Sequence, residues 1–117
     1  MHDNELATAE HEHNFSAPPE FRVALPQLRR ILESVTFLET HPGFRAVTVA
    51  DMKTAWNSEL PTDLVPFCLQ QQLTHNDYYC FQRTNSGNIP KIVVFADHAI
   101  VYNWQDVAAF LQWLELQ

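Results

Sequence analysis

The stretch from Asp77 to Leu116 constrains the fold of this chain more than any other. Three short runs rich in aromatic and β-branched residues follow one another here, at 77–82, 92–95 and 99–102. Polar residues with Gly, Asn and Asp separate these runs, and such an alternation is the usual signal of consecutive strands and turns. The segment 83–88 is a loop by composition. The sequence therefore predicts an antiparallel meander in the C-terminal half.

A helix is predicted to follow the third strand, with Asn103 as its N-cap. An Asn side-chain oxygen can accept a hydrogen bond from a free backbone N–H in the first turn of a helix. Four apolar residues then recur at the spacing of a single helical face: Val107, Phe110, Leu111 and Leu114. Because three strands alone bury little apolar surface, a helix across one face of the sheet would complete a core.

The N-terminal half predicts further helices and strands. A first helix is expected within 21–38, with Pro26 in its first turn and one apolar stripe formed by Leu28, Ile31, Leu32 and Val35. Weaker patterns predict a strand at 45–49 and a short helix at 50–57 that Thr48 could cap.

A strand is also predicted at 64–69, where Pro66 lacks a backbone donor and so indicates a sheet edge or a bulge. Together these elements predict a single α+β domain, in which an antiparallel sheet packs against helices and a C-terminal helix closes the chain.

Composition divides the chain into an acidic lead, 1–20, and a domain, 21–117. The lead contains five acidic residues and no Lys or Arg, so it carries most of the net charge of −7. It has few large apolar residues and contains Pro18 and Pro19 near its end, so we expect it to be flexible. The acidity opposes binding to nucleic acid. Because the sequence contains no membrane-length apolar run and no secretory signal, the expected location is the cytoplasm.

No residue pattern predicts catalysis or a cofactor. The segment His11-Glu12-His13 lacks the ligand spacing of a zinc site, and Asp97-His98 is more typical of a hairpin turn than of an acid–base pair. The cysteines, Cys68 and Cys80, each lie in an apolar run. A disulfide between them is conceivable, but a reducing compartment favours two buried thiols.

The aromatic content is more informative. Tyr and Trp side chains are enriched at binding hot spots, although core packing is the commoner role of any single one. An open aromatic face of the sheet, rimmed by carboxylates, would suit a basic protein partner. The hypothetical partner-binding residues are Trp56, Asp63, Asp77, Tyr79, Asp97 and Trp104.

Several motifs resemble, in order, those of the SMI1/KNR4-like (SUKH) domain superfamily, over residues 21–116. They are the helix LPQLRRIL at 25–32, the strand LVPFC at 64–68, the strand NDYYCF at 76–81, the strand and turn IPKIVVFADH at 89–98, and the closing segment WQDVAAFL at 104–111. The resemblance implies an α+β fold and a protein-binding role without enzymatic activity. Its bacterial members are immunity proteins that neutralise toxins, often nucleases, by one-to-one binding.

Two other functions stay open. The chain could be a small ligand-binding or enzymatic domain that uses a sheet face as a pocket. It could also be an interaction domain of a regulatory complex, as the fungal members of the superfamily are in cell-wall regulation. A homodimer that pairs through an edge strand is compatible with each of these functions.

Overall fold

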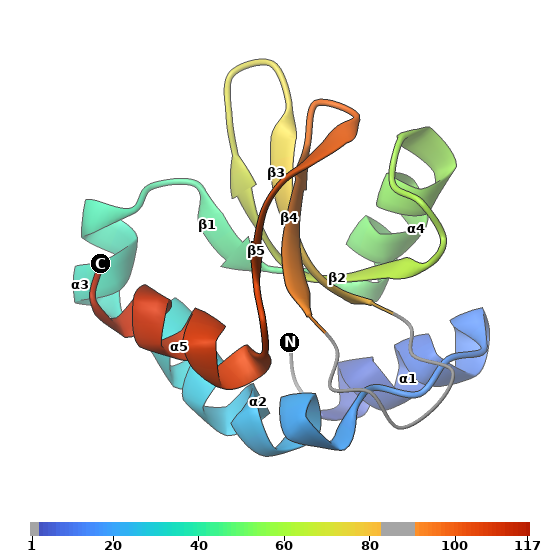
Figure 1. Cartoon of the computed structure of the whole chain (residues 1–117), viewed down its shortest axis with the longest axis horizontal. Helices are drawn as coiled ribbons and strands as arrows, with labels where there is room; N and C mark the ends of the chain where they lie inside the picture. Colours follow the sequence, from blue (N-terminus) through green and yellow to red (C-terminus); the bar gives the residue numbers. More distant parts are fainter. Residues whose placement is uncertain (1–2, 83–90) are drawn as a thin grey trace.

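A five-stranded antiparallel sheet forms the centre of the molecule, with helices around it (Figure 1). The computed structural model describes residues 3–82 and 91–117. The elements are α1 (Asp3–His13), α2 (Pro19–Leu32), α3 (Val35–Thr40), β1 (Phe44–Ala46), α4 (Val49–Ser58), β2 (Leu64–Gln71), β3 (Asn76–Gln82), β4 (Ile92–Ala96), β5 (Ala99–Trp104) and α5 (Val107–Glu115). The predicted α+β class, C-terminal meander and closing helix are confirmed. The predicted loop at 83–88 lies outside the described residues.

The strands follow one another in the sheet in the order of the sequence. Each strand pairs with the next, so the order is β1-β2-β3-β4-β5 and every pairing is antiparallel. The register shifts between Pro66 and Cys68 of β2, which is the bulge that Pro66 indicated. A bulge lets an inner strand accept a residue that has no backbone donor.

The face of the sheet that carries Tyr79 and Phe81 meets α5 and α2. The ring of Tyr79 lies 5.7 Å from that of Phe110 on α5, and the ring of Phe81 lies 4.8 Å from that of Phe21 on α2. Neighbouring residues of a strand point to opposite faces. Accordingly Arg45, next to Phe44 in β1, meets α4 instead, where its guanidinium pairs with Asp51. Helices thus contact both faces of the sheet (Figure 1).

The end of β5 corrects the predicted start of the closing helix. Strand β5 continues through Asn103 to Trp104, because the Trp104 ring packs 5.0 Å from both Phe110 and Trp113. The helix therefore begins later, with Asp106 as its N-cap, whose Oδ1 accepts a hydrogen bond from the Ala109 N–H at 2.8 Å. The apolar stripe predicted for this helix is buried as expected.

Residues 3–20, which the sequence predicted as a flexible lead, form helical structure that packs on the rest of the domain. They form α1 and a turn, and α1 packs on α4. Leu6 is 2% exposed and Ala9 is wholly buried, so two apolar residues one turn apart pack into the core. At its end the His13 ring lies 4.7 Å from that of Trp56, and Phe15 packs 6.1 Å from Phe81. The lead belongs to the domain core.

The first predicted helix also begins and ends elsewhere. Helix α2 starts at Pro19, whose fixed φ and missing N–H suit the first turn, and this places Pro26 inside the helix. The helix ends at Leu32, so Val35 leaves the predicted stripe and begins α3, where it is 70% exposed. In contrast, Thr48 caps α4 as predicted, in a reciprocal capping box with Asp51.

We expect Leu6→Ala to lower the free energy of unfolding by about 2–4 kcal/mol, because it removes a buried side chain and leaves a cavity. The matched control is Leu73→Ala, at a fully exposed leucine, which we expect to change stability by less than about 0.5 kcal/mol. Urea unfolding measures both values. Equal, near-zero effects would contradict the docking of α1 on the core.

The Arg45–Asp51 pair predicts a pH dependence of stability. The hydrogen bond from Arg45 is the main cause that lowers the pKa of Asp51 from 3.8 to about 2. The charged carboxylate therefore stabilises the fold above the unfolded-state pKa, and this contribution is lost as the pH falls from about 4 to about 2. We expect Asp51→Asn to cost about 1–2 kcal/mol at neutral pH. The difference from the unmodified protein should shrink over that window, and a constant difference would contradict the assignment.

Candidate partner-binding groove

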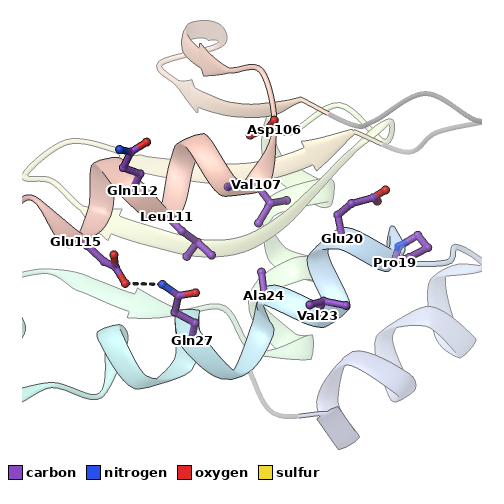
Figure 2. A pocket seen from close by; sticks show the side chains of 11 residues that line it. Pro19, Glu20, Val23, Ala24, Gln27, Asp106, Val107, Leu111, Gln112 and Glu115 are labelled. Carbon is purple, nitrogen blue, oxygen red and sulfur yellow. Dashed lines mark hydrogen bonds between the residues drawn. The ribbon is translucent and has the colours of Figure 1, made fainter.

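A groove of about 640 Å³ runs between α2 and α5 on the surface of the protein (Figure 2). Its α2 wall is formed by Pro19, Glu20, Val23, Ala24 and Gln27. Its α5 wall is formed by Asp106, Val107, Ala108, Leu111, Gln112 and Glu115. The two helices begin at the same end of the groove. At the other end the Gln27 side-chain amide donates a hydrogen bond to the Glu115 carboxylate, which joins the two walls.

The floor of the groove is apolar because side chains of the core form it, with a small residue on each wall. Val107 and Leu111 are buried, yet both line the groove. Ala24 and Ala108 line the groove as well, and their side chains are short. Val23 lines the same groove and is 82% exposed. Exposed apolar side chains gathered in one concave site are typical of a binding surface.

The charged side chains of the groove are all acidic. Glu20 and Asp106 lie at the end where the helices begin, and Glu115 lies at the opposite end (Figure 2). The last turn of α5 contains no basic residue, so Glu115 adds its charge to the negative end of the helix dipole. No Lys, Arg or His belongs to the described lining. Arg30 follows Gln27 by three residues on α2 and lies outside it.

The predicted aromatic binding face does not form at Tyr79 and Trp104. Both side chains are buried in the core, in contact with α5, because α5 covers the face of the sheet that carries them. Trp56 is half-buried, and its indole N–H donates to the Leu64 carbonyl at 2.8 Å. These aromatic side chains hold the fold together, and the first two are not available to a partner.

The three predicted rim aspartates do not gather in one place. Asp63 precedes Leu64, which pairs with Gln82, whereas Asp77 lies at the other end of the β2–β3 ladder. There Asp77 contacts His75 and accepts a hydrogen bond from Gln72. Asp97 stands in the tight β4–β5 turn with a positive φ, as the hairpin prediction required. Asp77 and Asp97 therefore share one end of the sheet and Asp63 lies at the other, so the structure does not bring all three into one rim.

The cysteines are two free, buried thiols, as predicted. Cys68 lies opposite Tyr79 in the ladder, and Cys80 lies opposite Pro66, so the two side chains point to opposite faces of the sheet. Burial raises the pKa of both thiols well above the ordinary value. A protonated, buried thiol is a poor nucleophile.

Within residues 3–82 and 91–117, no three His, Cys, Asp or Glu side chains are grouped so that they could hold a metal ion. His98 lies 3.6 Å from Glu59, so its ring nitrogen faces that carboxylate. None of the helices in the described part is both long and apolar enough to cross a membrane.

The outer strand of the sheet provides a second exposed surface. Strand β5 has no neighbour on its outer side within the described sheet. It exposes Ile100, Val101 and Tyr102 and contains no charged residue. Uncharged edge strands are the ones that pair most readily with another chain. A homodimer through this edge stays a prediction.

No protein-family model, no curated protein and no solved structure matches this chain. The resemblance to the SUKH superfamily thus stays a hypothesis, which depends on its ordered sequence motifs.

We expect both thiols to be protected from 5,5′-dithiobis(2-nitrobenzoate) in the native protein. Labelling should be at least about 100-fold slower than in denaturant, because the thiols react only after the sheet opens. In denaturant, both Cys68 and Cys80 should react. A native thiol that reacts at the denatured rate would contradict the burial of that cysteine.

Proposed function

We propose that this chain is a non-enzymatic protein-binding module that acts by one-to-one binding to a protein partner. The groove between α2 and α5 carries this proposal, because it combines an apolar lining, which includes the exposed Val23, with acidic ends. Apolar contact would supply most of the affinity, while the carboxylates would attract a basic partner and exclude an acidic one. The role that fits best, together with the sequence motifs, is that of an immunity protein that occludes a basic toxin domain.

The second candidate is a small-ligand site in the same groove. Its volume of about 640 Å³ lies within the usual range of ligand pockets. Such pockets hold a few polar groups that converge on the ligand, whereas the carboxylates of this groove stand at its ends (Figure 2). That distribution favours a protein partner. A regulatory interaction domain would use the same surface, so only the identity of the partner separates it from an immunity protein.

Two exposed valines allow a matched test of the groove. Val23 lines the groove at 82% exposure, and Val35 begins α3 at 70% exposure outside it. Neither side chain supports the core, so we expect Val23→Glu and Val35→Glu to leave the melting temperature unchanged within about 2 °C. Val23→Glu places a charge on the apolar floor beside existing carboxylates and should weaken binding at least about tenfold.

The measurement compares quantitative affinity capture from the source cell by the tagged unmodified chain and both variants. We expect one protein to be held at equal stoichiometry by the unmodified chain and by Val35→Glu, and to be lost with Val23→Glu. That protein, once purified, is titrated by calorimetry to measure the stoichiometry and the loss of affinity. Equal capture by both variants would exclude the groove, and a metabolite in place of a protein would favour the ligand site.

A further inference from the structure

We infer that the groove between α2 and α5 receives one amphipathic α-helix of the partner, with basic residues at both ends of its apolar face. This inference rests on the proposed function, since it names the kind of partner that the same groove would bind. Three observations carry it: the helical nature of both walls, the length between the acidic ends, and the sign of the charges.

The walls favour a helix over an extended peptide. A strand binds by adding its backbone hydrogen bonds to a free sheet edge. Both walls of this groove are helices, whose interior N–H and C=O groups are already paired along the helix axis. An extended peptide would leave its own backbone groups without partners there. A helix satisfies its backbone internally and presents only side chains, as the groove requires.

The small residues of the walls would allow a third helix to come close. Each wall contributes one short side chain to the groove, Ala24 on α2 and Ala108 on α5. Packed helices approach to about 8–10 Å between axes, and the shortest distances occur where the facing side chains are small. Val23, Val107 and Leu111 would then contact apolar residues of the bound helix. Those residues would recur at i, i+3 or i+4, and i+7.

The acidic ends define the length and the charge of the bound helix. Asp106 and Glu115 are nine residues apart, and a helix that rises 1.5 Å per residue spans about 13.5 Å over that distance. The partner would therefore present two to three turns, with Lys or Arg before and after the apolar stripe. The stronger contact is expected at Glu115, because it lies at the negative end of α5, whereas Asp106 lies at the positive end. Each carboxylate already accepts one hydrogen bond, Glu115 from Gln27 and Asp106 from Ala109.

The test uses three synthetic helical peptides of about 15 residues. The first has an apolar i, i+3, i+4, i+7 stripe between lysine-containing ends. The second replaces these lysines with glutamates, and the third keeps the composition of the first but scrambles the order of the stripe. Each is titrated into ¹⁵N-labelled protein. We expect only the first to shift the amide resonances of the groove, above all those of Val23, Ala24 and Leu111.

A charge reversal in the protein sharpens the test. Glu115→Lys should weaken binding of the lysine peptide about three- to tenfold and improve binding of the glutamate peptide. The same substitution of an exposed acid outside the groove, Glu39→Lys, should change neither affinity by that amount. Thermal melts check that both variants are folded.

The outcomes separate this inference from the proposed function. If the lysine peptide causes no groove shifts while Val23→Glu still loses the captured protein, the helix inference is overturned and the protein-binding function stands. If the scrambled peptide binds equally well, the groove does not select an amphipathic helix, and the inference is again overturned. If Val23→Glu retains the captured protein, the proposed function at this groove fails, whatever the peptides do.

Discussion

The fold depends on the aromatic contact between the sheet and α5. Tyr79 of β3, Trp104 at the end of β5, and Phe110 and Trp113 of α5 form one continuous set of ring contacts. Burying large rings removes much apolar surface from water, and tilted or edge-on ring pairs add to this stabilisation. These contacts fix the position of α5 against the sheet. They also explain why the most attractive binding candidates in the sequence are unavailable to a partner.

The groove is a consequence of where that contact places α5. Once Phe110 and Trp113 face the sheet, Ala108 and Gln112 must face away from it, and Leu111 lies at the boundary beside α2. The same argument applies to α2. Its Phe21 and Leu25 are buried, so Val23 is turned outward. A groove lined by Val107, Leu111 and the exposed Val23 is left between the two helices. Larger side chains in this groove would bury more apolar surface and would stabilise the fold. The groove is therefore not explained by stability alone.

The N-terminal helix shows how little apolar sequence is needed to dock a segment. Leu6 and Ala9 are one turn apart, and a single leucine with a small neighbour allows α1 to lie close to α4. The chain then crosses to α2 through a turn in which the Ala17 N–H donates to Glu10 at 2.8 Å. Composition alone predicts such a segment to be flexible, because it counts apolar residues without knowing whether a matching surface lies nearby.

Local sequence patterns were enough to predict the class of the fold, the antiparallel meander, an edge or a bulge at Pro66, and the apolar stripe of α5. These features follow from local patterns: the period of apolar residues, turn residues between runs, and a proline that lacks a donor. Thr48 could also be named as a cap of α4, because a cap residue stands next to the helix that it caps. In α2, the one available hint of a binding surface was Val23, an apolar residue off the buried stripe.

Tertiary packing was needed to show which helices cover each face of the sheet, where residues 3–20 dock and which acids share a site. Glu20 and Glu115 are far apart in the sequence, and they line one groove because the core holds α2 against α5. Asp63 and Asp77 are much closer in the sequence, yet the β2–β3 ladder places them at opposite ends. Sequence distance fixes spacing within one element, whereas the packing of buried side chains fixes which elements meet. A binding surface built from two helices therefore becomes visible only in the folded chain.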